Sequence, residues 1–238
     1  MVGTVLLGDL TWTDLDDRPR TLVVPVGSVE QHGPHLPIST DVRVAEAVAS
    51  GLHARVPDLV LAPALAYGAA GEHEGFPGTV SLGHDALYTV LLEYGRSACR
   101  WASRLLFVNG HGGNVATLTG AVDRLRYEAR DVAWLACVPA REAGVPHDAH
   151  AGRVETSLML ALAPRLVRDH AAAAGATAPL GELLDRMQAG GVAAVSPNGV
   201  LGDPAGASAD EGRRLLDGMV ATAAAAVGRW QPAGGRLR

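Results

Sequence analysis

Four side chains that can bind metal ions or move protons lie in one short stretch, GSVEQHGPHLPISTD at residues 27–41. They are Glu30, His32, His35 and Asp41, and they directly follow an apolar run. Residues two apart in an extended segment point to the same side, so Glu30 and His32 can reach one ion. Asp41 comes nine residues after His32, and the intervening prolines restrict the loop that must return it to the same point. The stretch therefore predicts one half of a metal site.

Two later segments carry the side chains expected to complete that site. His111 lies in NGHGGN, where glycines permit close approach of the backbone. Glu155 lies in RVETSLMLALA, a predicted helix, and a carboxylate on its largely buried face needs either a cation or an arginine as partner. His150 comes five residues earlier and is suited to proton transfer as a neutral imidazole. Oxygen and nitrogen donors suit Zn²⁺, Mn²⁺ or Fe²⁺, and a shared carboxylate allows two ions.

Other polar residues of these segments receive supporting roles. His73, in the glycine-rich segment GEHEGFPGTVSL, is assigned to substrate contact or to support of the ligands. His35 is expected to be structural or to support the ligands rather than to bind an ion. Glu72 and Glu74 are expected to be solvated, and residues 76–78 are expected to form a rigid wall of the substrate pocket.

The elements that must position these residues follow from hydrophobic periodicity. Apolar, β-branched runs predict strands at residues 21–26, 59–62, 104–108 and 132–138. Helical spacing of apolar residues predicts helices between and after them, the first capped by Thr40 and the last near residues 209–227. This alternation indicates a three-layer α/β sandwich with a mainly parallel sheet, in one domain spanning residues 1–238. Ligands bind beyond the carboxyl ends of such strands, which is where Glu30 and His111 are expected.

Composition excludes several classes of protein. The 238 residues carry a formal charge of −5, without clusters of lysine and arginine, so nucleic acid is not an expected partner. No segment approaches ~20 uninterrupted apolar residues, and the N-terminus lacks a leader pattern, so we expect a cytoplasmic protein without a membrane partner. Cys99 and Cys137, predicted within a helix and a strand, are expected to be reduced, packed thiols.

The four motifs GSVEQHGPHLPISTD, GEHEGFPGTVSL, NGHGGN and HAGRVETS resemble those of the creatininase family of metal-dependent amidohydrolases. The resemblance spans most of the chain. It implies an α/β fold, a centre of two divalent ions (Fe²⁺ and/or Zn²⁺, with Mn²⁺ as an alternative), hydrolysis of a C–N bond by metal-activated water, and a homohexamer. On the matching positions it gives Asp41 as the bridge between the ions. We assign to His150, from its place just before the predicted helix, the role of proton donor to the leaving amine. The implied metal ligands are Glu30, His32, Asp41, His111 and Glu155.

The resemblance also points to a branch of that family. Creatininases proper carry an acidic ligand two residues after the histidine of the third motif, where this chain has Gly113. Glu155 looks like its replacement, as in the branch that includes formamide hydrolases. Creatininases proper also place a tryptophan where this chain has Pro146 and His147. The motifs are most similar to those of the creatininase-like peptidases of mycofactocin maturation, which implies release of a modified C-terminal Val-Tyr dipeptide from a precursor peptide.

Alternative functions differ in their chemistry. Within the family they are creatinine or formamide hydrolysis, and outside catalysis a metal-stabilised protein that only holds the peptide. Nucleophilic hydrolysis by Ser28 with His32 as base is disfavoured, because the G-x-S-x-G elbow is missing. Phosphate binding by NGHGGN is also disfavoured, since the segment matches neither G-x-G-x-x-G nor a P-loop.

Overall fold

Four parallel strands form the centre of the computed structural model, which describes residues 6–15, 20–140 and 148–238. Their order in the sheet is β2-β1-β3-β4. The strands are β1 (Thr21–Val26), β2 (Leu59–Leu61), β3 (Arg104–Asn109) and β4 (Val132–Ala136). The first prediction is confirmed in both bounds, and the other three differ by one or two residues at their ends. β4 stops at Ala136, before the predicted residue 138, because its pairing partner β3 ends at Asn109.

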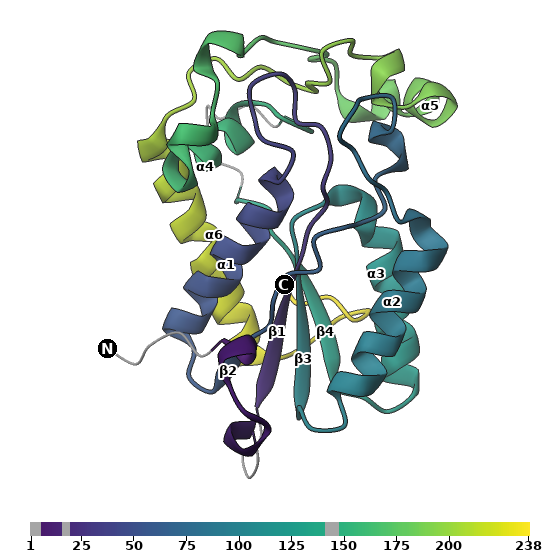
Figure 1. The fold of residues 1–238 in the computed structure, drawn as a ribbon, viewed down its shortest axis with the longest axis vertical. Helices are drawn as coiled ribbons and strands as arrows, with labels where there is room; N and C mark the ends of the chain where they lie inside the picture. The colour runs from purple at the N-terminus through teal and green to yellow at the C-terminus, as the bar shows by residue number, and fades with distance from the viewer. Residues whose placement is uncertain (1–5, 16–19, 141–147) are drawn as a thin grey trace.

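Helices cover both faces of the sheet, as Figure 1 shows, which confirms the three-layer α/β sandwich. Successive strand residues point to opposite faces, so Val24 and Phe107 pack in one core while Val23 and Val108 pack in the other. The first core contains residues of α2 (Gly83–Ala98) and α3 (Val115–Tyr127). The second contains residues of α1 (Thr40–Arg55), α4 (Arg153–Leu162) and α6 (Ala209–Arg229).

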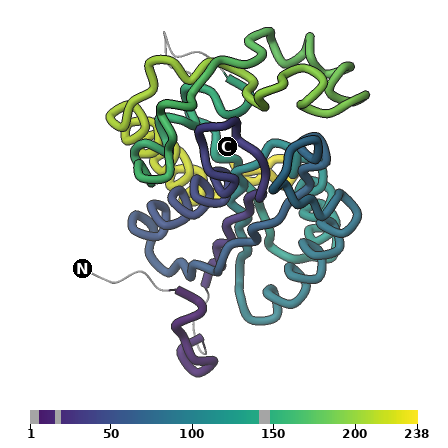
Figure 2. Tube along the Cα trace, turned by 45° about the horizontal axis from the view of Figure 1, so that its top comes forward, coloured from purple at the N-terminus to yellow at the C-terminus, as the bar shows by residue number. Residues whose placement is uncertain are grey.

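The segment between α4 and α6 lies outside these layers. It contains α5 (Leu180–Gly190), which packs on a separate small cluster of buried residues. Seven short 3₁₀ helices complete the described elements: Leu7–Asp9, Trp12–Leu15, Gly71–His73, Gly112–Asn114, Pro164–Leu166, Asp169–Ala171 and Val192–Ala194. Figures 1 and 2 place α5 and the loop after β1 at the same end of the molecule, beyond the carboxyl ends of the strands.

Two local predictions are corrected. Ser39, not Thr40, occupies the N-cap position of α1, and the Thr40 hydroxyl instead donates to the Pro37 carbonyl at 2.7 Å. Cys99 lies one residue beyond α2 and Cys137 one residue beyond β4, although both are free, partly buried thiols as expected. Burial raises the pKa of both thiols, so neither is prepared to act as a nucleophile. None of the helices in the described ranges is long and apolar enough to cross a membrane.

Candidate metal centre

The loop after β1 and the start of α1 bring Glu30, His32 and Asp41 together, as the sequence predicts. All three side chains are buried. His32 Nδ1 lies 3.1 Å from the carbonyl oxygen of Glu30, to which it can donate, and His32 Nε2 lies 3.1 Å from Asp41 Oδ1. Gly110 permits the approach of α1, since a Cβ at that position would lie 2.4 Å from the Asp41 carbonyl oxygen. With Nδ1 donating, a neutral His32 presents the lone pair of Nε2 toward Asp41.

His111 joins the same group from the end of β3. Its Nδ1 lies 3.1 Å from Glu30 Oε2 and 3.1 Å from Asp41 Oδ2. Its Nε2 lies 3.0 Å from the carbonyl oxygen of Ala69 and donates to it. A neutral His111 therefore points the lone pair of Nδ1 between two carboxylates, and Asp41 has one oxygen facing each of two histidines.

Glu155 approaches from the first turn of α4. Its Oε2 lies 3.8 Å from His32 Nε2 and accepts a hydrogen bond of 2.6 Å from the backbone of Ala151. The arginine nearest in sequence, Arg153, pairs instead with Glu211 at 3.0 Å. Among the described residues, the ion pairs of Glu30, Asp41 and Glu155 are all with histidines. The arginine partner considered for Glu155 is therefore not found in this part of the chain.

The carboxylates of Glu30, Asp41 and Glu155 shift the pKa values of the histidines at the centre. Burial disfavours the charged form of His32, but Asp41 and Glu155 outweigh it and raise the pKa of His32 to about 10. Burial likewise opposes a charged His111, yet hydrogen bonds with Asp41 and Glu30 raise its pKa well above the ordinary value. Burial raises the pKa of Glu155 to about 7, against the attraction of His32. Protons on imidazoles thus balance the acids where no other cation is bound.

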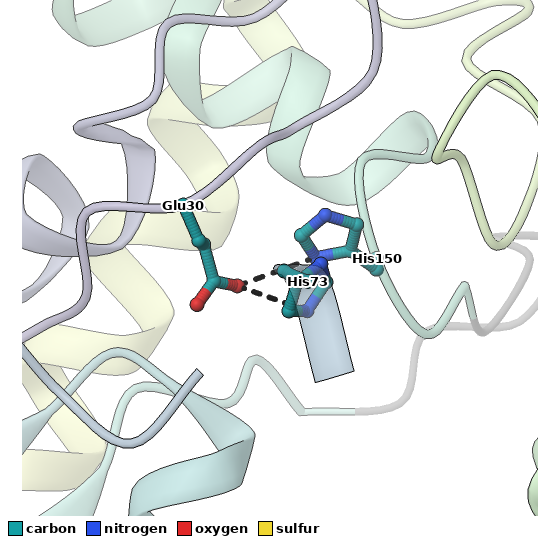
Figure 3. A group of neighbouring side chains, drawn as sticks. All are labelled: Glu30, His73 and His150. Carbon is teal, nitrogen blue, oxygen red and sulfur yellow. Dashed lines mark ion pairs between the residues drawn. The ribbon is translucent and has the colours of Figure 1, made fainter. Parts of the chain in front are cut away.

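A third group, shown in Figure 3, consists of Glu30, His73 and His150. His73 Nε2 lies 3.2 Å from Glu30 Oε1, and His150 Nδ1 lies 3.9 Å from the same oxygen. His73, given a supporting role by the sequence, thus reaches the centre directly from the 3₁₀ helix Gly71–His73. His150 is buried and its ring lies between those of His32 and His73, at centroid distances of 4.2 Å and 4.4 Å.

Gln31 determines which ring nitrogen of His73 and of His150 carries the proton. This role of Gln31 was not predicted from the sequence. Its Oε1 accepts from the Gly33 backbone at 2.9 Å and its Nε2 donates to the Gly199 carbonyl at 3.0 Å, so the amide orientation is set. The same Nε2 lies 2.8 Å from His73 Nδ1, which must then accept. The backbone oxygen of Gln31 lies 2.7 Å from His150 Nε2, which donates to it.

The two histidines therefore present opposite groups to Glu30. His73 turns the N–H of Nε2 toward the carboxylate, whereas His150 turns the lone pair of Nδ1 toward it. Burial and the charge of His111 lower the pKa of His73 to about 3. Burial and the charge of His32 lower the pKa of His150 well below its ordinary value. Both rings are thus neutral near pH 7. The available signal for Gln31 was its place between Glu30 and His32.

Gly113 occupies the position where creatininases proper are expected to carry an acidic ligand. A Cβ there would lie 2.4 Å from His111 Nε2, 2.5 Å from the Ala69 oxygen and 2.7 Å from Glu72 Oε1. Any side chain would therefore disturb the hydrogen bond that orients His111. The packing of this chain leaves no room for an acid at position 113, and Glu155 is a further carboxylate that approaches His32 Nε2 beside Asp41.

The remaining predicted site residues lie at the edge of the centre. His35 is buried and its Nε2 lies 2.9 Å from Thr156 Oγ1, next to Glu155 on α4. Glu72 is partly buried, with Oε1 3.6 Å from His111 Nε2, so it is less solvated than expected, whereas Glu74 is exposed as expected. Phe76 packs under α5 in the small cluster, and residues 76–78 do not line the cavity over the centre, so they are not the wall that was predicted. Pro146 and His147 lie outside the described residues.

Histidines and carboxylates cluster beyond the carboxyl ends of a parallel sheet, as in metal-dependent hydrolases with an α/β fold. Similarity to known proteins identifies the family. The family model described as creatinine amidohydrolase (Creatininase) matches residues 8–227. The chain belongs to the creatininase family, and it is a hydrolase acting on C–N bonds.

Relatives and solved structures agree with this membership. The chain is 53% identical over 232 residues to a protein of Mycolicibacterium smegmatis and 51% identical over 234 residues to one of Mycobacterium ulcerans. Both are named mycofactocin precursor peptide peptidase, and each match covers 95% of this chain and 92% of the relative. A solved mutant creatininase, in which a tryptophan is replaced by alanine, has a TM-score of 0.83 at 28% identity, with 97% of this chain and 100% of that chain covered.

Two further creatininase structures carry metal names in their descriptions. One is a mutant of Zn-Zn type, in which a glutamate is replaced by glutamine, with a TM-score of 0.81 at 30% identity. The other is described as Creatininase Mn, with a TM-score of 0.80 at 29% identity. Each match covers 97% of this chain and 100% of the other. These proteins share the fold of this chain, and the chain's own clusters are candidates for the same kind of ion.

Proposed function

We propose that this protein is a peptidase that uses two divalent ions to cleave a peptide bond of the mycofactocin precursor peptide, releasing its modified C-terminal Val-Tyr dipeptide. The observation that carries the proposal is the excess of buried carboxylate at the centre. Both carboxylate oxygens of Glu30 and Oδ2 of Asp41 are buried, and among the described residues only histidine nitrogens face them, without a lysine, an arginine or a backbone N–H as partner. Buried carboxylates without such partners are costly unless a cation lies against them.

The donor set fits two ions that share one carboxylate. Glu30, Asp41 and His111 would hold the first, with donor atoms 3.1 Å from the His111 nitrogen. His32, Asp41 and Glu155 would hold the second. Nitrogen and oxygen ligands of a tetrahedral ion lie about 3.3 Å apart when each bond is about 2.0–2.1 Å. Asp41 would be the bridge, because each of its oxygens faces a different histidine.

The donor chemistry limits the metals without choosing among them. Imidazole and carboxylate ligands suit Zn²⁺, Fe²⁺ and Mn²⁺, and the related creatininases described as Zn-Zn and Mn forms support this range. When bound, such ions make water a nucleophile at neutral pH and polarise the scissile carbonyl. His73 is not included among the ligands, because Gln31 leaves its Nε2 as a donor toward Glu30.

His150 is the group that would move the proton. Its Nε2 is held by the Gln31 carbonyl, so Nδ1 faces the centre as an acceptor. A ring that is neutral near pH 7 can take up a proton at this atom and return it to the leaving amine. His73 and Gln31 would keep Glu30 and His150 in the required orientations.

The substrate assignment rests on the relatives and on Gly113. Two relatives that are more than 50% identical are named for the mycofactocin precursor peptide. Creatinine hydrolysis is the weaker candidate, since position 113 has no space for the acid that creatininases proper are expected to use. The proposal includes a homohexamer acting in the cytoplasm, which light scattering after size exclusion and fractionation of cells would test.

The proposal is tested by removing and restoring the metal. Protein stripped by a chelator should release no dipeptide from the precursor peptide, and added Zn²⁺, Fe²⁺ or Mn²⁺ should restore release. Mass spectrometry of the peptide distinguishes this from a protein that only holds it, which would bind metal and peptide without turnover. Full activity of the completely stripped protein would refute the mechanism.

Two other mechanisms receive no support from the geometry. Ser28 is fully buried, and both ring nitrogens of His32 face groups other than its hydroxyl. A phosphate near the loop of residues 109–114 would meet the carboxylates of Glu30 and Asp41. Like charges at this distance repel, so a nucleotide is disfavoured.

A further inference from the structure

Helix α5 carries an apolar face that is only partly buried. Leu180, Leu183, Leu184 and Met187 follow one another at the spacing of a single helix face. Leu183 packs with Val192 in the small buried cluster, and Met187 packs against that cluster. Leu180 and Leu184 are each 43% exposed. Leucines at such positions are available for contact with a bound molecule.

Three of these apolar residues, Leu180, Leu184 and Met187, line the same cavity as the candidate metal ligands. The cavity has a volume of about 240 Å³ and is lined by Glu30, Asp41, His111, His150 and Glu155 among its polar groups. Leu180, Leu184, Met187 and Leu201 line it as well. We call these four residues the α5 wall. Ligand sites commonly combine apolar contact area with a few converging polar groups, and this volume suits one or two residues rather than a long peptide.

The α5 wall is connected to His150 by backbone hydrogen bonds. His150 N donates to the Leu201 carbonyl at 3.2 Å, and Leu201 N donates to the His150 carbonyl at 2.8 Å. The wall is also continuous with the segment that carries His73, because Gly191, directly after α5, would place a Cβ 2.7 Å from the Glu72 carbonyl oxygen. Leu201 is therefore held beside the group that would protonate the leaving amine, and the end of α5 lies against the segment that carries His73.

We infer that the α5 wall receives an apolar side chain from the residue whose amine leaves. This inference rests on the proposed function, in which His150 protonates that amine. A residue with its amine near His150 places its side chain next to Leu201 and the exposed leucines of α5. An apolar side chain buries both its own surface and theirs, whereas a polar one would lose hydrogen bonds to water without replacement. The wall thus selects apolar residues after the scissile bond.

Two peptides of equal length test the selection on the metal-loaded enzyme. One ends in Val-Tyr and the other in Ser-Ser. The wild type should cleave the first with a kcat/KM at least about tenfold higher, the usual effect of a hydrophobic pocket on small differences in side chain. The double variant Leu180→Ala/Leu184→Ala should reduce this ratio to within about threefold. Leu166→Ala is the matched control, since Leu166 is 42% exposed and does not line the cavity.

Calorimetry with the dipeptides Val-Tyr and Ser-Ser distinguishes failure of the α5 wall hypothesis from failure of the proposed peptidase activity. If the wild type cleaves neither peptide but binds Val-Tyr more tightly than the double variant does, the proposed function fails and the wall stands. Cleavage without preference, or a preference that the double variant keeps, overturns the wall and leaves the peptidase. A double variant that changes only the oligomeric state, measured by light scattering, would show that a second copy covers the leucines and would also overturn the inference.

Discussion

The substitution Gly113→Ala tests whether the hydrogen bond that orients His111 is needed for metal binding. A Cβ at position 113 would lie 2.4 Å from His111 Nε2 and 2.5 Å from the Ala69 oxygen. These two atoms form the 3.0 Å hydrogen bond that turns Nδ1 toward Glu30 and Asp41. Loss of a hydrogen bond that orients a ligand typically lowers metal affinity about 10- to 100-fold, or about 1.4–2.8 kcal/mol. We expect a loss within this range for Zn²⁺.

The adjacent glycine provides the matched control. A Cβ on Gly112 would meet no atom within 4 Å, so Gly112→Ala makes the same chemical change without a collision. Affinity is measured by competition for Zn²⁺ with a chelator of known strength, and circular dichroism confirms that both variants are folded. The reasoning is refuted if folded Gly113→Ala binds Zn²⁺ within about threefold of Gly112→Ala.

Three further predictions concern protons, hydrogen bonds and packing. His32, with a pKa of about 10, and His111, whose pKa is also raised, hold protons at pH 8 in the metal-free protein. Binding of Zn²⁺ should release these protons, so affinity should rise by at least about tenfold per pH unit from pH 7 to 9. Calorimetry in buffers of different ionisation enthalpy should detect the release, and its absence would contradict the assignment. Gln31→Leu leaves His73 Nδ1, the Gly199 carbonyl and the Gly33 N–H without their partner, and each should lower the free energy of unfolding by about 1–3 kcal/mol. Urea unfolding measures this loss. The control Gln188→Leu, on the exposed side of α5, should change stability by less than about 0.5 kcal/mol. In α6, Gly212→Ala would place a Cβ 1.9 Å from the Ser157 carbonyl oxygen and should destabilise the protein by about 1–3 kcal/mol. Gly218→Ala, where a Cβ meets no atom within 4 Å, should stabilise the protein by about 0.5–1 kcal/mol. Equal melting temperatures of the two variants would contradict this packing argument.

Much of the fold and half of the centre could be predicted from local sequence. The strand Thr21–Val26 is marked by a β-branched apolar run, and the order of strands and helices indicated the three layers. Because parallel strands end at one edge of the sheet, the positions of Glu30 and His111 after two such strands placed them together. These predictions depended on periodicity and chain order, which a single sequence contains.

Other features depend on contacts between segments that are far apart in the chain. The Gln31 amide is fixed by Gly199, which lies 168 residues away, and this contact decides which nitrogen His73 offers to Glu30. No local pattern encodes such a contact. Glu72 is less solvated than expected for the same reason, because the approach of His111 is set by tertiary packing.

The sequence by itself determined the class of fold, the types of donor atom and their positions at the ends of strands, since these follow from residue type and periodicity. Only the tertiary structure decided that position 113 has no space for an acid, that Glu155 faces histidines rather than Arg153, and that α5 places leucines over the centre. The physical reason is that free volume, hydrogen-bond direction and the burial of charge are properties of packed neighbours, which come together only when the chain has folded.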